Sequence, residues 1–149
     1  MSIIKRAALV STAVVAGIVT LTAVAPPPAF AGTALLNGAV INDSAYPATA
    51  IRNWCLSGGS TGTLTTTRPT CGSDQASRGL APRGGRTPSN EDWDVVQIDA
   101  GWCYYVKFAL PGQPDNHTRY DRRGKSMAYV KVEDFAAAHV VAQSTSTCP

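Results

Sequence analysis

The fold of this chain is decided by residues 89–108, SNEDWDVVQIDAGWCYYVKF. Two runs of alternating apolar residues flank Asp99-Ala100-Gly101, and such runs predict β-strands. A three-residue turn with Gly101 in the left-handed conformation predicts a hairpin that pairs Val96 with Tyr104. One face of this hairpin would form a core surface from six apolar residues: Val96, Ile98, Trp102, Tyr104, Val106 and Phe108.

The same stretch carries four acidic residues. Strands rise about 3.3 Å per residue, so we expect Asp94 and Asp99 to lie about 15 Å apart, too far to share a proton or a metal ion. Glu91, Asp92 and Asp94 could converge on calcium, which takes several oxygen ligands. No calcium-loop spacing is present, and the alternative is a solvated turn in which an aspartate caps backbone donors. The sequence predicts no cofactor and no metal, and leaves this one question open.

The beginning of the chain has the layout of a secretory signal peptide. Two basic residues precede an uncharged apolar run, residues 7–25, and Ala29-Phe30-Ala31 is a small-x-small cleavage signal. The alternative is an uncleaved membrane anchor, because the run approaches the length of a bilayer span. We expect residues 1–31 to be cleaved. That would leave residues 32–149, 118 of the 149, as a single secreted, extracellular domain with one modest core.

The expected mature domain is close to neutral. Without Lys5 and Arg6, 11 of the 13 basic residues remain against 10 acidic residues. Global electrostatic binding to nucleic acid or to an anionic membrane therefore has no support. We expect a monomer whose partner is an unknown extracellular protein or carbohydrate, with no nucleic acid and no membrane contact after cleavage.

Four cysteines lie in the expected mature domain, and an even count in a small exported chain predicts two disulfides. No Cys-x-x-Cys pair exists, and the two histidines do not have zinc-site spacing relative to the cysteines. Three pairings are possible. We favour Cys55–Cys71, which closes a Gly/Thr-rich loop, together with Cys103–Cys148, which ties the C-terminal tail to the central strands.

Turn signals every 8–12 residues and the absence of helical periodicity predict an all-β chain. We expect a single small antiparallel β-sandwich or barrel of about seven short strands. Outside the opening stretch, the expected strands lie near residues 40–41, 49–54, 64–67, 80, 118–134 (two strands and a turn) and 136–144.

Four aromatic residues suggest a binding module rather than an enzyme. They fall on or near the less apolar faces of the expected strands, where exposed rings can stack on sugars or anchor a partner protein. The alternative is that a two-sheet fold buries them. The residues are Trp54, Trp93, Tyr105 and Tyr129.

A secreted proteinase inhibitor is the alternative function. Residues 76–88 contain Arg78, Arg83 and Arg86 close to the expected Cys55–Cys71 bridge, and could present a basic residue to a protease. The three glycines of this loop oppose the rigid conformation that such inhibition requires.

A small secreted ribonuclease is a more distant alternative, because it needs an acid–base pair and cationic phosphate binders. His139 lies in an apolar strand and is expected in the core or at its rim. No Gly-x-Ser-x-Gly hydrolase element occurs. The candidate phosphate-cleaving residues are His117, Arg119, Arg122, Arg123 and Lys125, with Glu133 or Asp134 as the acid.

Several short motifs, spread over about residues 38–144, resemble small secreted β proteins of actinobacteria that carry no assigned activity. The resemblance implies export and a compact β fold, and it transfers no catalytic residue. In size and in its two expected bridges the chain is also similar to secreted bacterial subtilisin inhibitors, but its motifs do not match their reactive region. The motifs are RNWC, L-x-P-x-G-G-x-T-P, DWD…DAGWCYYVKF, YDRRG and YVKVED.

Overall fold

The computed structural model describes residues 37–149, so the predicted signal peptide lies outside the described residues. The described chain is all-β, as predicted, and forms a sandwich of two sheets with ten strands rather than about seven. The extra strands are short pieces within segments that read as loops. The strands are β1 (Ala39–Asn42), β2 (Ala48–Ile51), β3 (Leu64–Thr65), β4 (Ser77–Leu80), β5 (Gly85–Arg86), β6 (Val95–Ile98), β7 (Cys103–Ala109), β8 (Asn116–Asp121), β9 (Ala128–Lys131) and β10 (Ala137–Ser144).

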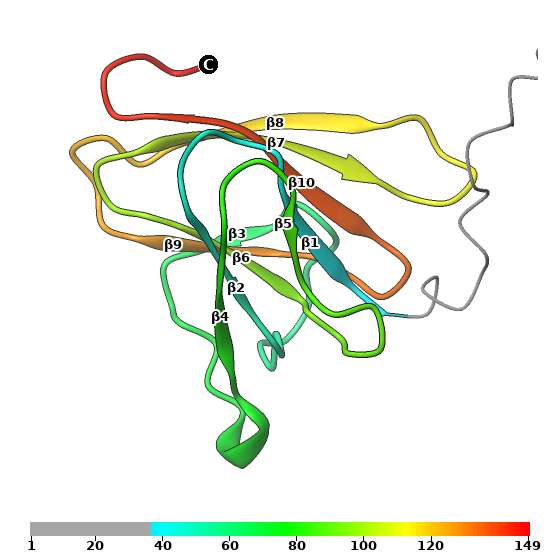
Figure 1. Cartoon of the computed structure of the whole chain (residues 1–149). Coiled ribbons are helices and arrows are strands. Elements are labelled where there is room, and N and C mark those ends of the chain that lie inside the picture. The colour runs from blue at the N-terminus through cyan, green and yellow to red at the C-terminus, as the bar shows by residue number, and fades with distance from the viewer. Residues whose placement is uncertain (1–36) are drawn as a thin grey trace, which may run out of the picture. The chain divides into compact units, whose positions relative to one another are not determined.

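Each sheet has five strands (Figure 1). The first, sheet A, has the order β5-β1-β10-β7-β8, and the second, sheet B, has the order β3-β9-β6-β2-β4. All neighbouring strands run antiparallel except β1 and β10, which are parallel. The last strand therefore occupies the centre of sheet A, between β1 and β7.

The predicted hairpin of the opening stretch is wrong, although its core face is right. β6 belongs to sheet B and β7 to sheet A, so the chain arches from one sheet to the other instead of pairing the two strands edge to edge. In place of the predicted Val96–Tyr104 pair, Val96 pairs with Val130 and Ala50 in sheet B, and Tyr104 pairs with Tyr120 and Gln143 in sheet A. Alternation shows which side chains point inward, but it does not name the partner strand.

The arch is closed by hydrogen bonds that differ from those of a hairpin. Gly101 has a φ of +83°, as predicted, and its N–H donates to the carbonyl of Arg122. The carboxylate of Asp99 accepts from the Tyr104 hydroxyl at 2.9 Å and from the Gln97 amide at 2.8 Å. Burial raises the pKa of Tyr104, so this phenol remains a donor.

The main core lies between the two sheets. The inward residues of β6 and β7 meet there face to face, and Trp93 packs with them at 3 % exposure. Trp102 is only half-buried and packs edge-on against Tyr46, with ring centroids 5.0 Å apart. The fully buried members of this core from the two strands are Val96, Ile98, Tyr104, Val106 and Phe108.

A second, smaller cluster lies on the opposite face of sheet B. Adjacent strand residues point to opposite faces, so Val96 points into the main core and Val95 points into this second cluster. Trp54, Ile51 and Tyr129 complete this cluster, and the Trp54 indole N–H donates to the carbonyl of Gly58.

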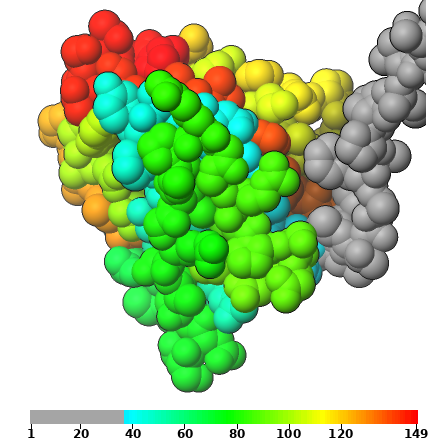
Figure 2. All heavy atoms as spheres, in the orientation of Figure 1, coloured from blue at the N-terminus to red at the C-terminus, as the bar shows by residue number. Residues whose placement is uncertain are grey.

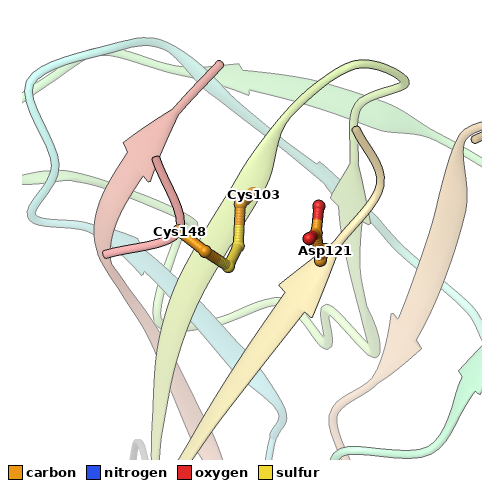
Figure 3. Close-up of side chains that lie close together, drawn as sticks. All are labelled: Cys103, Asp121 and Cys148. Atoms are coloured by element: carbon orange, nitrogen blue, oxygen red, sulfur yellow. A yellow bond between two sulfur atoms is a disulfide. The ribbon is translucent and has the colours of Figure 1, made fainter. Parts of the chain in front are cut away.

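Both favoured disulfides, Cys55–Cys71 and Cys103–Cys148, are confirmed. The first anchors the segment that carries a short 3-10 helix, Gly72–Asp74, which projects from the lower end of the sandwich in Figures 1 and 2. The second holds the C-terminal segment against sheet A (Figure 3). Among residues 37–149, no helix has the length and apolar character needed to cross a membrane.

Removing the Cys103–Cys148 bridge with paired serine substitutions should lower the free energy of unfolding by about 4 kcal/mol, because it closes a loop with a sequence separation of 45. The same change at Cys55–Cys71, with a separation of 16, should cost about 3 kcal/mol. Urea unfolding followed by circular dichroism measures both values. A Cys103/Cys148 variant as stable as the wild type would show that this bridge does not constrain the unfolded chain.

Candidate functional site

Three aspartates from two chain segments converge at one end of the interior strands β6 and β9 of sheet B. Asp92 and Asp94 precede β6, and Asp134 follows β9, the antiparallel neighbour of β6. Val95 pairs with Lys131, so the beginning of β6 lies beside the end of β9. One carboxylate oxygen from each aspartate lies within 4.8 Å of the other two.

Gly38 binds Asp92 and lies close to Asp94. Its N–H donates to Asp92 Oδ1 at 2.6 Å, and its carbonyl accepts from the N–H of Trp93 at 3.0 Å. A Cβ atom at this position would lie 3.0 Å from the Trp93 carbonyl oxygen and 3.3 Å from an oxygen of both Asp92 and Asp94. Position 38 therefore suits glycine because the carboxylates approach its backbone closely.

Asp94 is the centre of the cluster. Its Oδ2 accepts from the backbone N–H of Trp54 at 3.2 Å, whereas its Oδ1 is shielded from solvent and has no hydrogen-bond donor among the described residues. Burial, together with the neighbouring carboxylates of Asp92 and Asp134, raises the pKa of Asp94 to about 7. A buried carboxylate oxygen without a donor requires a proton or a cation.

The cluster opens into a pocket of about 460 Å³. Lys131, the one basic residue of its lining, donates to the carbonyl of Gly59 at 2.8 Å and lies 3.9 Å from a Glu133 oxygen. Among residues 37–149, none of the three aspartates forms an ion pair. Their negative charges therefore lack a protein cation. The pocket is lined by Trp54, Asp94, Lys131, Val132, Glu133 and Asp134.

The donor set is chemically selective. It offers carboxylate oxygens and no thiolate or imidazole, which suits a hard cation such as calcium rather than zinc or copper. Calcium takes six to eight oxygens in a flexible arrangement, and three carboxylates would leave positions for water or a ligand in the open pocket. The competing occupant is a proton shared between Asp92 and Asp94.

The sequence identified part of this cluster. Of the three acids that could converge on calcium, Asp92 and Asp94 lie together, whereas Glu91 pairs with Arg52 at 3.2 Å. Asp99 takes no part and is bonded within the β6–β7 arch. Asp134 was missed, because only the β6–β9 pairing brings it close. The signal that could have found it is an acidic pair, Glu133-Asp134, directly after a strand-like run.

Three of the four candidate binding aromatics are buried, which is the alternative that the sequence left open. Trp54 and Tyr129 are each 6 % exposed because segment 54–58 and neighbouring apolar residues cover that face of sheet B, and Trp93 lies in the main core. Tyr105 is half-buried on the outer face of sheet A. Stacking of a ligand on the first three rings has no accessible surface in this conformation.

The three arginines of segment 76–88 do not share one loop. Arg78 lies in β4 at the edge of sheet B, Arg86 in β5 at the edge of sheet A, and Arg83 in the turn between them. The turn is well anchored, because the buried Asn42 side chain donates to the carbonyls of Leu80 and Ala81.

The backbone N–H of Arg83 is used in a hydrogen bond within the protein. The φ of Arg83 is +59°, and its N–H donates to the carbonyl of Ser44. A protease binds its substrate backbone in an extended conformation through hydrogen bonds. Arg83 is not extended, so it lacks the conformation that an inhibitory loop presents.

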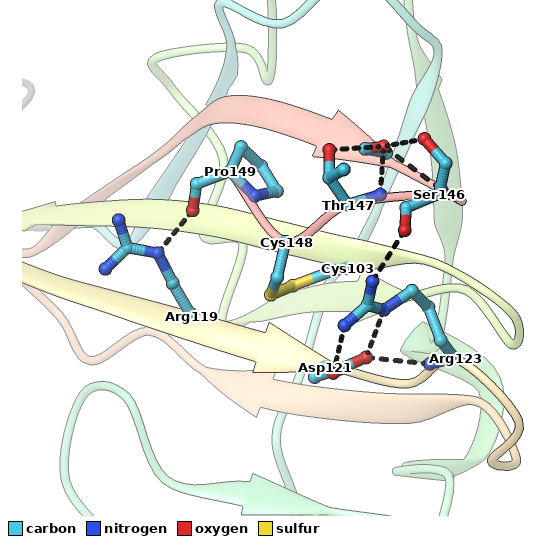
Figure 4. Close-up of polar contacts among 9 residues, drawn as sticks. Cys103, Arg119, Asp121, Arg123, Ser146, Thr147, Cys148 and Pro149 are labelled. Carbon is cyan, nitrogen blue, oxygen red and sulfur yellow. Dashed lines mark hydrogen bonds and ion pairs between the residues drawn. A yellow bond between two sulfur atoms is a disulfide. The ribbon is translucent and has the colours of Figure 1, made fainter.

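A second group of potential ligands, Cys103, Cys148 and Asp121, is unsuited to a metal (Figure 3). Both sulfurs are joined in the disulfide, so neither is a thiolate. Asp121 accepts from the Arg123 guanidinium, which lowers the pKa of this carboxyl below its usual value. Arg123 also donates to the Ser146 carbonyl, so this cluster fastens the C-terminal segment (Figure 4).

Comparison of the chain with known protein families, with curated protein sequences and with solved structures gives no match.

The raised pKa of Asp94 predicts a pH-dependent stability. Between the ordinary value of 3.8 and about 7 the folded state binds the Asp94 proton and the unfolded state does not. Stability should therefore fall as the pH rises from about 4 to about 7, when divalent cations are absent. Solvent in the open pocket screens part of the effect, so we expect a loss of about 1 to 2 kcal/mol.

Urea unfolding at several pH values in excess chelator measures this loss. Asp94→Asn should flatten the dependence across the same pH window and should be more stable than the wild type at neutral pH. A wild-type stability that rises over this window would contradict the assignment.

Proposed function

We propose that this protein is an extracellular, disulfide-stabilised binding module that binds a divalent cation of the calcium type at Asp92, Asp94 and Asp134. The observation that carries the proposal is the shielded Asp94 Oδ1, which has no donor among the described residues and belongs to a cluster of three carboxylates without an ion-pair partner. A bound cation would supply the positively charged partner that this oxygen lacks.

A proton alone accounts for the site less completely. One proton neutralises one carboxylate, and it leaves two negative charges on the other two within 4.8 Å. A divalent cation can contact all three at once and removes the mutual repulsion that raises the pKa of Asp94. The three aspartates also come from two chain segments, so a bound cation would join the approach to β6 with the end of β9.

Export supports calcium as the cation. Two disulfides are typical of chains that fold in an oxidising, extracytoplasmic compartment. Calcium sites of extracellular modules have dissociation constants of about 0.1 to 1 mM, which matches a site with few protein ligands and room for water. A proteinase inhibitor receives less support, because the backbone of Arg83 is turned and hydrogen-bonded.

Calcium should stabilise the wild-type protein at about pH 8. With calcium at ten times its dissociation constant, the free energy of unfolding should rise by about 1.4 kcal/mol, which corresponds to several degrees in Tm. Asp94→Asn, Asp92→Asn and Asp134→Asn should each remove most of this response. Thermal unfolding with calcium or with chelator measures it, and isothermal titration calorimetry gives the affinity.

Glu91→Gln is the matched control, because this neighbouring acid pairs with Arg52 outside the cluster and its variant should keep the calcium response. Magnesium should stabilise less, since it demands a tighter octahedral site. A wild type that is equally stable in calcium and in chelator would overturn the proposal. The proton would then be the sole occupant of the cluster.

A further inference from the structure

A second pocket, of about 280 Å³, opens at the end of sheet A where β7 passes into β8. The loop between these strands, at the right of Figure 1, forms part of its lining, and residues 60–61 with Glu133 form the rest. Of its lining residues, only Glu133 also lines the pocket of the three-aspartate cluster. The second pocket is therefore a separate place for a ligand.

The inner part of this pocket is apolar. Phe108 belongs to the main core and is fully buried, so its ring closes the pocket toward the space between the sheets. Leu110 packs against the same core from the beginning of the loop, and Pro114 adds a third apolar side chain nearer the solvent. A ligand in the pocket can bury one apolar face against these three side chains.

The outer part carries polar side chains that the fold does not use. Among residues 37–149, the side chains of Ser60, Gln113 and Asn116 form no hydrogen bond with the protein, and all three residues are exposed. A side-chain amide both donates and accepts, and so does a hydroxyl. The pocket therefore offers unused donors and acceptors beside its apolar part.

Hydrogen bonds fix the side of the pocket that residues 60–61 and Glu133 form. Glu133 Oε2 accepts from the N–H and the hydroxyl of Thr61 at 2.9 and 3.2 Å, and the Glu133 N–H donates to that hydroxyl at 3.0 Å. The Tyr120 hydroxyl donates to the carbonyl of Gly62 at 2.8 Å. A Cβ atom at position 62 would lie 3.3 Å from this hydroxyl, and the φ there is +92°, so the close approach suits glycine. A pocket fixed in this way reduces the ordering cost of binding.

The charge of the lining selects against anions. Glu133 is its one charged residue, and its Oε1 lies 3.9 Å from the Lys131 ammonium, beyond hydrogen-bond distance, so this oxygen can still accept from a ligand. A phosphate or carboxylate ligand would find no cation in the lining and would meet the Glu133 charge.

The basic residues that the sequence offered for RNA cleavage lie outside this pocket and have partners of their own. His117 Nδ1 lies 2.8 Å from the Tyr105 hydroxyl. Arg122 donates to the Ser126 carbonyl, and Arg123 donates to Asp121. The pocket therefore suits a neutral ligand rather than a nucleic acid.

From this arrangement we infer that the second pocket binds a neutral carbohydrate through a single pyranose ring. A pyranose has C–H groups on its faces and hydroxyl groups around its rim, which matches an apolar inner part beside a polar outer part. Pockets for drug-sized ligands have about 300 to 1,000 Å³. A volume of about 280 Å³ therefore suits one sugar ring.

The bound ring packs its C–H face on Phe108 and Leu110, and its hydroxyls bond to Gln113, Asn116 and Glu133 Oε1. A carboxylate is the strongest acceptor of this set, because hydrogen bonds to a charged group are stronger than neutral ones. The inference rests on the proposed function as a binding module and does not require the cation.

The test is titration of the ¹⁵N-labelled protein, in excess EDTA, with the methyl glycosides of glucose, galactose, mannose and N-acetylglucosamine. Concentrations up to about 20 mM cover dissociation constants in the millimolar range. At least one glycoside should shift the side-chain amide signals of Gln113 and Asn116 and the backbone signal of Thr61, and the shifts should saturate. The side-chain amide of Asn90, exposed but outside the pocket, should not shift.

Variants separate binding in the pocket from binding elsewhere. Gln113→Ala and Asn116→Ala each remove a group that the fold does not use, so they should keep the wild-type Tm and weaken binding about 2- to 10-fold, the effect of one neutral hydrogen bond. Glu133→Gln should weaken it about tenfold or more, because the acceptor loses its charge. Asn90→Ala, a matched loss of an exposed amide, should bind like the wild type.

No shift with any of the four glycosides would refute the inference, and so would wild-type affinity in all three pocket variants. Because EDTA is present throughout, the sugar titration and the calcium response are measured independently. Sugar binding without a calcium response would overturn the cation site alone. A calcium response without sugar binding would overturn the sugar site alone.

Discussion

The sandwich depends on the arch that carries the chain from β6 to β7. Before the arch, Val96 and Ile98 of β6 point into the core from sheet B. After it, Tyr104, Val106 and Phe108 of β7 point into the core from sheet A. Because the arch stacks these apolar faces instead of joining two strand edges, one short stretch of chain supplies core residues from both sheets. The Asp99 carboxylate, bonded to Gln97 and Tyr104, keeps the two flanks at the correct separation.

The arch also determines which strands lie beside β6 and β7. With β6 inside sheet B, its beginning lies against the end of β9, and this contact brings Asp134 to Asp92 and Asp94. With β7 inside sheet A, Lys107 acquires a histidine on each side. In a hairpin, β6 would have occupied one of these neighbouring positions. The three-aspartate cluster therefore follows from this choice of strand partner.

The all-β class, both disulfides, the inward residues of β7 and the left-handed Gly101 could be predicted from the sequence, because each depends on local pattern or on cysteine count. The partner of β6 could not, since alternation gives the inward face and says nothing about which strand lies alongside. The sequence left the burial of Trp54 and Tyr129 open for a related reason. Their face of sheet B is polar enough to read as solvent-exposed, and segment 54–58 covers it.

The candidate site likewise has a part that the local sequence predicts and a part that depends on strand pairing. Asp92 and Asp94 were visible as an acidic pair before a strand, whereas Asp134 lies 40 positions after Asp94 and becomes a neighbour only through the sheet. His139 is half-buried, which fits the expected rim position, but the sequence does not show which strands lie beside it. Long-range pairing, rather than residue type, is the information that a single sequence lacks.

The position of β10 has a consequence for how the molecule is made. This strand is near the end of the chain and is inserted between β1 and β7, and it pairs with residues almost a hundred positions earlier. Sheet A cannot close until residues 137–144 have emerged, so this sheet remains incomplete during most of the chain's synthesis. Contacts of such sequence separation form slowly. Delayed closure would suit the export proposed above, because an extended polypeptide can cross a membrane through a channel that a folded sandwich cannot enter.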